Sequence, residues 1–206
     1  MKQNILNKAA NMFLTYGFKS VTMDDIANEI GVSKKTIYQH FKTKTKLVEA
    51  ATLYMFEFIS SGINDICACN KNPIDEIYEI KMFTMLHLKN EKSSPQYQLK
   101  KYYPKIFESL KNNQFHVMQD CVTNNLKRGV LEGLYRKTID IDFISRLYFN
   151  NMMTLKDVDI FPRNTFPMSH LMDTFLEYHI RGISTEKGLA KLETILQNQD
   201  TLKLNN

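Results

Sequence analysis

Apolar residues at the start of the chain recur at the spacing of an α-helix. One helix face is formed by residues three or four positions apart, namely Ile5, Ala9, Met12, Phe13 and Tyr16. Gly17 follows directly, and a glycine at this place is typical of a helix that ends in a residue of left-handed conformation. The pattern therefore predicts a first helix that ends at Tyr16 and packs through the side that carries Phe13.

Two short helices joined by a glycine turn are predicted next. Thr22 is a suitable N-cap for the first of them, and two aspartates follow it where carboxylates suit the helix dipole. Gly31 can adopt the positive φ of a tight turn, and Ser33 can cap the helix after it. The small Ala27 lets the two helices cross closely. Three aliphatic residues are expected to pack against the first helix: Ile30, Val32 and Ile37. This is the plan of a helix-turn-helix.

Beyond residue 49 the apolar pattern is coarser but still helical. Pro73 and Pro104 suit the first turn of a helix, Asp140 suits the start of another, and Gly129 and Gly133 mark a loop. No alternation typical of strands and no internal repeat is visible. We expect helices at residues 50–66, 73–89, 104–127, 140–156, 169–181 and 185–197, with breaks at 90–95 and 159–167.

Composition agrees with a helical globular protein. The chain has 206 residues, of which 43% are hydrophobic and 24% charged, as in ordinary folded domains. Only 7 glycines and 5 prolines are present, which favours long helices over a loop-rich β fold. The sequence predicts an all-α fold with an N-terminal three-helix domain at residues 1–48 and a larger helical domain at residues 49–206.

Other features of the sequence bear on its compartment. No apolar run is long enough to cross a membrane, and the first residues lack the apolar core of a signal peptide, so we expect a cytoplasmic protein without a membrane partner. Three cysteines, an odd and sparse number, indicate reduced thiols rather than a disulfide framework: Cys67, Cys69 and Cys121.

Positive charge is concentrated at the start of the chain. The first 49 residues hold eight lysines and four acidic residues, which indicates a polyanionic partner for this part. The third helix is expected to expose lysines that seek phosphates together with hydroxyl and amide groups that can bond base edges: Ser33, Lys34, Lys35, Thr36, Gln39 and His40. For any single lysine, a solvated surface position remains an equal alternative.

A specific resemblance supports the nucleic-acid hypothesis. The stretch from Phe13 to Leu47 reads FLTYGFKSVTMDDIANEIGVSKKTIYQHFKTKTKL and closely resembles the N-terminal domain of the TetR family of bacterial repressors. The matching positions are Gly17-Phe18, Thr22, Asp25-Ile26-Ala27, Gly31-Val32-Ser33, Thr36 to Phe41, Lys44 and Leu47. Members of this family are typically all-helical homodimers that bind palindromic operators and release them when a small molecule binds the C-terminal domain.

The resemblance also implies roles for individual residues. It implies that Thr36, with Lys34 and Lys35, contacts bases or the groove. It implies that Tyr38 and His40 contact the DNA backbone. It places Lys44 at the start of a fourth helix, where the ammonium group and the helix N-terminus hold a phosphate. Thr22 is expected to act similarly at its own helix. The full expected DNA-binding set is Thr22, Ser33, Lys34, Lys35, Thr36, Tyr38, Gln39, His40 and Lys44.

The resemblance assigns dimerisation and effector binding to the larger domain. The helices at 140–156 and 168–181 would form a four-helix dimer interface through Phe143, Leu147, Phe149, Met153, Leu171, Phe175, Leu176 and Tyr178. The many Met, Phe and Tyr residues suit a small apolar or aromatic effector, although they fill a helical core equally well. Candidate pocket residues are Met82, Phe83, Tyr102, Tyr103, Phe107, His116, Tyr148 and Met152.

Other functions receive less support. No catalytic motif or phosphate-binding loop is present, so we expect no enzyme, no cofactor and no metal site. A regulator that responds to a metal or to redox conditions through its cysteines is an alternative, although the spacing of Cys67 and Cys69 lacks the commoner metal-binding turn. A transcriptional activator with the same DNA-binding head is a further alternative, because the sign of regulation depends on the position of the operator.

Overall fold

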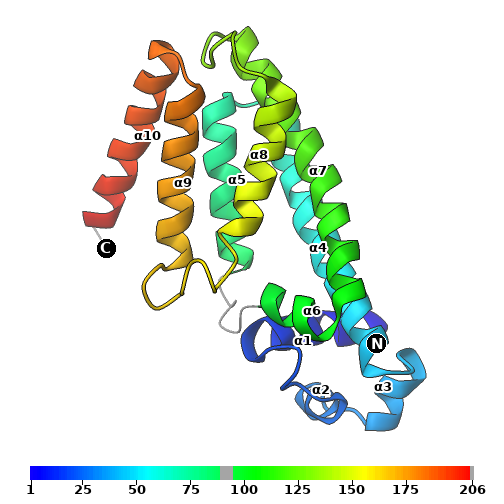
Figure 1. Ribbon diagram of the computed structural model, residues 1–206. Coiled ribbons are helices and arrows are strands. Elements are labelled where there is room, and N and C mark those ends of the chain that lie inside the picture. The colour runs from blue at the N-terminus through cyan, green and yellow to red at the C-terminus, as the bar shows by residue number, and fades with distance from the viewer. Residues whose placement is uncertain (89–94, 205–206) are drawn as a thin grey trace. The chain divides into compact units, whose positions relative to one another are not determined.

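The structure, a computed structural model, describes residues 1–88 and 95–204, with side chains up to residue 198 (Figure 1). These residues form helices and no strand, which confirms the all-α fold. The helices are α1 (Lys2–Tyr16), α2 (Met23–Glu29), α3 (Lys34–His40), α4 (Lys44–Ala68), α5 (Pro73–His87), α6 (Pro95–Tyr102), α7 (Pro104–Leu131), α8 (Ile141–Thr154), α9 (Met168–Ile183) and α10 (Glu186–Leu204).

The chain divides into two compact units. The N-terminal unit comprises residues Met1–Gly62 and Thr84–Phe115, and the C-terminal unit comprises Ile63–Phe83 and His116–Asn206. The chain passes between them within α4, α5 and α7. These units are defined by packing, and the functional division after residue 48 stays a prediction.

The core of the N-terminal unit is formed by apolar residues of α1, α2 and α3 together with the start of α4. Phe13 is buried at its centre and stacks on Phe18, with ring centroids 5.0 Å apart. The prediction for α1 was wrong at Tyr16, which is exposed, because the buried face of the helix turns toward Ala10 and Leu14 instead. Of the aliphatic residues expected inside, Ile37 is fully buried, whereas the two flanking the Gly31 turn, Ile30 and Val32, are only partly buried.

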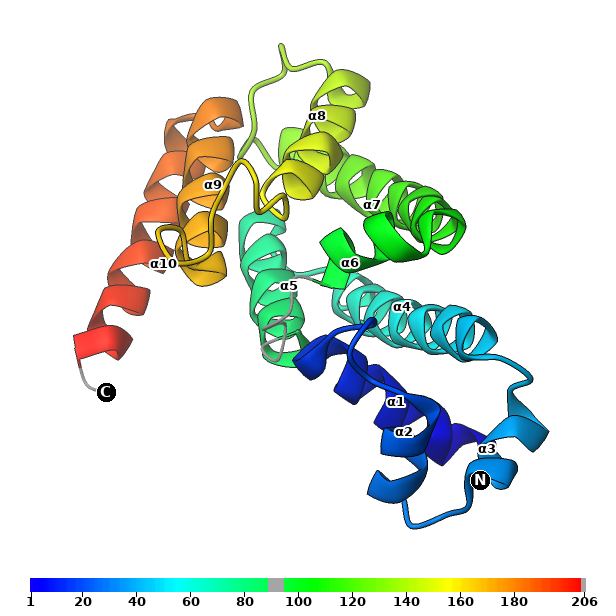
Figure 2. The same ribbon diagram turned by 60° about the horizontal axis from the view of Figure 1, so that its bottom comes forward.

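Local capping interactions explain where the short helices begin. The Thr22 hydroxyl accepts a hydrogen bond from Asp25 N, and the Asp25 carboxylate accepts one from Thr22 N in return, which makes a reciprocal capping box. The Ser33 side chain caps α3 by accepting a hydrogen bond from Thr36 N. Gly31 has φ +68°, a conformation that favours glycine, as the turn required. Figure 2 shows the resulting pair of short helices joined by this turn.

Helix α1 is followed by Gly17, and the structure shows a reason for this glycine that the sequence did not reveal. Gly17 has a positive φ of 89° but a ψ of 153°, so it does not adopt the left-handed helical conformation that we expected. The side chain of Gln98 occupies the place where a Cβ atom at Gly17 would stand, and Gln98 Oε1 accepts a hydrogen bond from Lys19 N at 3.2 Å. A segment of α6 therefore fixes the conformation of the loop after α1.

Helix α6 itself was not predicted. The expected break at 90–95 lies mostly outside the described residues, but Pro95 already begins this helix. Most of its residues are polar, and only Leu99 is a large aliphatic side chain that enters the core of the N-terminal unit. Because a single buried leucine produces no helical periodicity, the pattern gave no signal for this helix.

Boundaries in the C-terminal unit also differ from those expected. Helix α7 continues to Leu131, so the prediction that Gly129 marks a loop was wrong, whereas Gly133 does lie in a turn with φ +72°. The prediction of Asp140 as a helix start is confirmed, because its side chain accepts a hydrogen bond from Phe143 N at 3.1 Å. Helices α9 and α10 lie side by side in both views (Figures 1 and 2).

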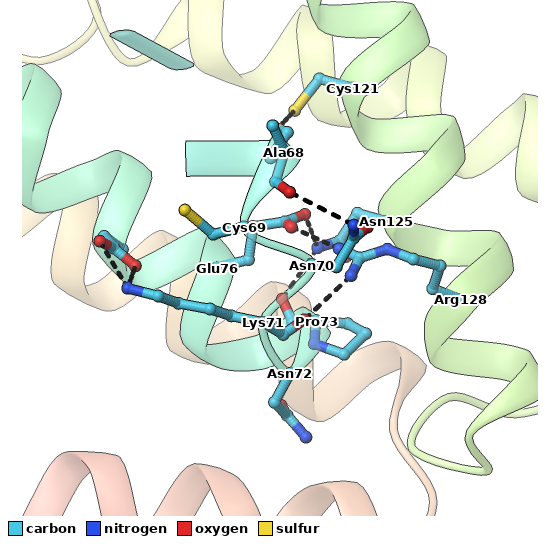
Figure 3. A network of polar contacts seen from close by, with 12 residues as sticks. Ala68, Cys69, Asn70, Lys71, Asn72, Pro73, Glu76, Cys121, Asn125 and Arg128 are labelled. Carbon is cyan, nitrogen blue, oxygen red and sulfur yellow. Dashed lines mark hydrogen bonds and ion pairs between the residues drawn. The ribbon is translucent and has the colours of Figure 1, made fainter. Parts of the chain in front are cut away.

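A buried polar network joins the start of α5 to α7 within the C-terminal unit (Figure 3). Glu76 is only 1% exposed and forms an ion pair with Arg128. The amide of Asn125 donates to Glu76 Oε1 and to Pro73 O, each at 2.8 Å, and accepts from the Tyr135 hydroxyl at 3.2 Å. The buried carboxylate is therefore both paired in charge and hydrogen-bonded, as buried charged groups in proteins generally are.

Candidate nucleic-acid interface

Helix α3 presents an exposed polar surface on the N-terminal unit. Most of the residues predicted for this surface are exposed, and Thr36 alone is partly buried: Ser33, Lys34, Lys35, Thr36, Tyr38, Gln39 and His40. The helix is held by its Ser33 cap and by Ile37, its one buried residue, so its other side chains lie at or near the surface. The structure thus brings these seven predicted residues together on one short helix and its cap.

The Lys34 side chain interacts with the neighbouring helix. Its ammonium group lies 2.6 Å from Asp24 Oδ2 on α2. This hydrogen bond raises the pKa of Lys34, so the side chain stays fully charged. Both groups are more than half exposed, and exposed pairs of this kind contribute little stability. A phosphate can therefore replace the aspartate as the partner of Lys34.

Ser33 and Thr36 form a local hydroxyl pair at the start of α3. Their hydroxyl oxygens are 2.9 Å apart, and either can be the donor. Thr36 lies in the first turn of the helix, which is the part that reaches base edges when such a helix enters the major groove. The pair therefore orients the Thr36 side chain before any DNA is bound.

Thr22 is already engaged in the capping box of α2. Its hydroxyl donates to Asp25 Oδ2 at 2.8 Å and accepts from Asp25 N at 3.1 Å. The hydrogen bonds from the Thr22 backbone and hydroxyl hold the pKa of Asp25 below its usual value. A phosphate contact by this hydroxyl requires its hydrogen atom to turn away from Asp25.

Lys44 stands at the first position of α4, as expected. Its ammonium group donates a hydrogen bond to Lys19 O at 3.1 Å, which attaches the start of α4 to the loop after α1. Partial burial lowers the pKa of Lys44, and the nearby carboxylate of Asp25 opposes this effect. Since an ammonium group has three donors, the bond to Lys19 leaves two for a phosphate.

A cluster of lysines and tyrosines adjoins Lys44 and was missed in the sequence. The Lys19 ammonium lies 5.3 Å from the centroid of the Tyr102 ring, and Lys101 lies 5.6 Å from the rings of both Tyr102 and Tyr97. Lys19 and Lys101 are far apart in the sequence, so only the fold brings their charges close to one another. These residues extend the positive surface beside the predicted phosphate contact.

The predicted effector-binding residues divide between the two units. Tyr102, Tyr103 and Phe107 belong to the N-terminal unit, where Tyr103 and Phe107 pack against the core around Phe13. The other five lie in the C-terminal unit, and of these Met82 and His116 are exposed, whereas Phe83, Tyr148 and Met152 are partly buried.

The sequence did not single out His179, and it assigned Phe175 to the dimer interface rather than to the surroundings of Tyr148. The Tyr148 ring lies 5.5 Å from that of Phe175 and 5.0 Å from that of His179. Burial lowers the pKa of His179 to about 4, so this imidazole is neutral at pH 7. The three rings form a largely apolar cluster inside the C-terminal unit, and its polar groups are the Tyr148 hydroxyl and the neutral imidazole of His179.

The expected dimer residues fall into two groups. Phe143 is 59% exposed, Tyr178 is 75% exposed, and Leu147 is also exposed. The remaining residues are buried or partly buried within the protomer: Phe149, Met153, Leu171, Phe175 and Leu176. Of the expected dimer residues, only the first group leaves its apolar side chains exposed on the protomer.

Taken with the fold, this surface defines a class of protein. Two short capped helices joined by a glycine turn, with a basic and hydroxyl-bearing second helix, make the chain a helix-turn-helix DNA-binding regulator. Residues 5–51 match the family model of the bacterial regulatory proteins, tetR family. This N-terminal part of the chain is a DNA-binding domain of the TetR family of transcriptional regulators.

Individual relatives agree with this assignment. The HTH-type transcriptional repressor KstR2 of Mycobacterium tuberculosis is 22% identical over 149 residues, which cover 69% of this chain and 72% of KstR2. The biofilm operon icaADBC HTH-type negative transcriptional regulator IcaR of Staphylococcus aureus is 30% identical over 83 residues, which cover 38% of this chain and 42% of IcaR. These relatives are regulators of transcription and not enzymes, in agreement with the sequence prediction.

Solved structures share the fold over nearly the whole chain. A transcriptional regulator from Saccharomonospora viridis in complex with choline has a TM-score of 0.70 and 16% identity, and the match covers 90% of this chain and 98% of that one. Within the described part of the chain, every helix is too short or too polar to cross a membrane. No group of three potential metal ligands occurs among the described residues.

Proposed function

We propose that this protein is a ligand-responsive transcriptional repressor of the cytoplasm that binds a palindromic operator as a homodimer. The observation that carries the proposal is the exposed surface of α3, held in place by the Ser33 cap and the buried Ile37. A small apolar or aromatic effector bound by the larger domain releases the operator. The two repressors among its relatives support the negative sign of regulation.

The side chains of α3 divide the work of DNA binding. Lys35, Thr36 and Gln39 read base edges in the major groove, because lysine, hydroxyl and amide groups match the donor and acceptor pattern displayed there. Tyr38 and His40 contact the DNA backbone from the same helix. Lys34 exchanges Asp24 for a phosphate.

Two further contacts hold the DNA backbone from outside α3. Lys44 binds a phosphate at the start of α4, where the helix N-terminus adds to the attraction. The Thr22 hydroxyl binds another phosphate at the start of α2. These contacts fix the position of the head on the duplex without reading its sequence.

Dimerisation is supported by the exposed apolar residues of α8 and α9. Phe143 and Leu147 lie one helical turn apart on α8, and Tyr178 lies on α9. Exposed apolar side chains gathered on neighbouring helices are typical of interaction surfaces. A dimer presents two heads to two half-sites, which raises a weak affinity of one head without any new type of contact.

The effector is assigned to a chemical class only. The ring cluster of Tyr148, Phe175 and His179 favours a ligand with apolar or aromatic surface. The ligands of similar proteins differ, since one is described as a ketosteroid transcriptional regulator and another is in complex with choline. The identity of the effector therefore does not transfer from either of them.

Replacing Lys44 with alanine tests the phosphate contact. We expect weaker binding to every DNA sequence and a salt dependence that is flatter by about one unit of slope for each head on the DNA, because one counterion fewer is released per phosphate. The measurement is the affinity of the full chain for duplex DNA, by fluorescence anisotropy at several salt concentrations.

Lys46→Ala is the matched control for this variant. Lys46 lies in the same turn of α4 but is exposed and paired with Glu49 at 2.6 Å, so its removal should change the slope much less. Thermal unfolding of both variants shows whether the lost bond to Lys19 has damaged the fold. An unchanged slope for a folded Lys44→Ala protein would contradict the assigned role of this lysine.

A further inference from the structure

Two cysteine side chains meet inside the C-terminal unit. Cys67 lies in the last turn of α4 and Cys121 lies in α7, 54 residues further along the chain. Their sulfur atoms are 3.2 Å apart, and neither forms a disulfide. Figure 3 shows the sulfur atom of Cys121 directed at the end of α4 near Ala68. The sequence alone did not pair these two residues.

The third cysteine is placed differently. Cys69 is exposed, whereas Cys67 and Cys121 are both partly buried. The Cys69 thiol donates to Asp65 O at 3.3 Å, and in Figure 3 its sulfur points away from Cys121. The chain thus contains one close pair of thiols and, two residues away, an exposed thiol outside that pair.

We propose that Cys67 and Cys121 are a site of oxidative modification, where a hydroperoxide converts the two thiols into a reversible intramolecular disulfide. The Cys67 thiolate attacks one oxygen of the hydroperoxide, the O–O bond breaks, and the other oxygen leaves and takes up a proton, so that Cys67 becomes a sulfenic acid. Cys121 then attacks this sulfur, the S–S bond forms, and the S–O bond breaks with loss of water. In total the two thiols lose two electrons and two protons, and the hydroperoxide is reduced to an alcohol, or to water, plus a further water.

The surroundings assign the first attack to Cys67. Burial raises the pKa of both thiols, and it does so strongly at Cys121. The hydrogen bond between the two thiols lowers the pKa of Cys67 and raises that of Cys121, whereas Arg128 lowers the pKa of both. Because thiolates are scarce at both sites, the first step is slow, but the short distance between the sulfurs makes the second step fast. The sulfenic acid is therefore captured before it is oxidised further.

The disulfide would join α4 to α7 within the C-terminal unit. It would close a long loop that contains α5 and α6, and cross-links of this kind stabilise mainly by restricting the unfolded chain. The bond lies close to the buried network of Glu76, Asn125 and Arg128, which connects α5 to the same helix α7 (Figure 3). Oxidation would give this unit a second, more rigid state.

The test treats the full-length protein with hydrogen peroxide and analyses it by mass spectrometry without reduction. We expect the mass to fall by two hydrogen atoms, a cross-linked pair of peptides that contain Cys67 and Cys121, and recovery of the starting mass with dithiothreitol. The oxidised protein should unfold at a temperature higher by about 5–10 °C. This result depends on neither an operator nor an effector.

Cysteine variants separate the proposal from general thiol oxidation. Cys69→Ser should form the same cross-link, whereas Cys67→Ser and Cys121→Ser should each lose both the cross-link and the rise in unfolding temperature. The proposal is overturned if peroxide modifies Cys69 alone, if the cross-link joins two chains, or if the disulfide forms without a rise in unfolding temperature.

Discussion

Replacing Gly129 with alanine is expected to lower the free energy of unfolding by about 3 kcal/mol. A Cβ atom at this position would overlap the ring of Tyr135, which is fully buried, so the ring or the helix must shift. Any shift of this ring also breaks the hydrogen bond from the Tyr135 hydroxyl to Asn125 and leaves a buried acceptor without its donor. Chemical denaturation of the full chain measures the difference.

Gly182→Ala is the matched control for this substitution. Gly182 also lies in a helix, α9, but nothing stands within 4 Å of the position of an added Cβ atom. Alanine is a better helix former than glycine, so this variant should be neutral or more stable by up to about 1 kcal/mol. If the two variants had equal stability, the close packing of Tyr135 on α7 would be refuted.

Replacing Glu76 with alanine should have an effect of similar size, a loss of about 3–5 kcal/mol. The substitution removes the ion-pair partner of the Arg128 guanidinium and the acceptor of one Asn125 hydrogen bond. The Asn125 amide stays buried and the Arg128 guanidinium stays partly buried, so both lose a partner that water replaces poorly. Breaking one side of a buried ion pair is more harmful than removing both sides, because an uncompensated charge is left. Thermal and urea unfolding measure this loss.

Two further variants make the interpretation specific. Glu79→Ala removes a carboxylate that pairs with Lys71 at the surface of the same helix, and it should lower the stability by less than about 1 kcal/mol. A double replacement, Glu76→Leu with Arg128→Met, should recover much of the lost stability, since no unpaired charge remains. An equal loss for Glu76→Ala and Glu79→Ala would show that the network contributes nothing beyond surface pairing.

Local features of the fold could be predicted well from the sequence. The Thr22, Ser33 and Asp140 caps and the Gly31 turn depend on interactions between residues at most four positions apart. Such interactions are visible in a linear pattern because the residue types that make them are few. The start of α4 at Lys44 came instead from the family resemblance.

Features that depend on distant contacts could not be predicted. We expected Gly129 to mark a loop, since glycine is common there. The structure instead requires a glycine within helix α7, because the ring of Tyr135 packs against this position from outside the helix. Tyr16 looked like a core residue because the spacing alone does not fix which side of a helix is covered. The pairing of Cys67 with Cys121 depends entirely on how α4 packs against α7.

The candidate interface shows the same division. The residues on α3 were found because they share one short helix and match a family pattern. The engagement of Lys34 with Asp24, and the position of Lys19 beside Tyr102, are products of tertiary packing and appear only in the structure. For the effector, neither the sequence nor the ring cluster around Tyr148 defines more than a chemical class.

The measurement that tests the central claim most directly is selection of binding sites from random duplex DNA by the full-length protein. We predict enrichment of one inverted repeat whose half-sites are about one helical turn apart, as expected for two heads of a dimer. Thr36→Ala should select the same spacing with different preferred bases, because it changes a base contact and leaves the phosphate contacts intact. Failure of the wild-type protein to enrich any sequence, or enrichment of a single site without a repeat, would contradict the proposal of a dimeric operator-binding regulator.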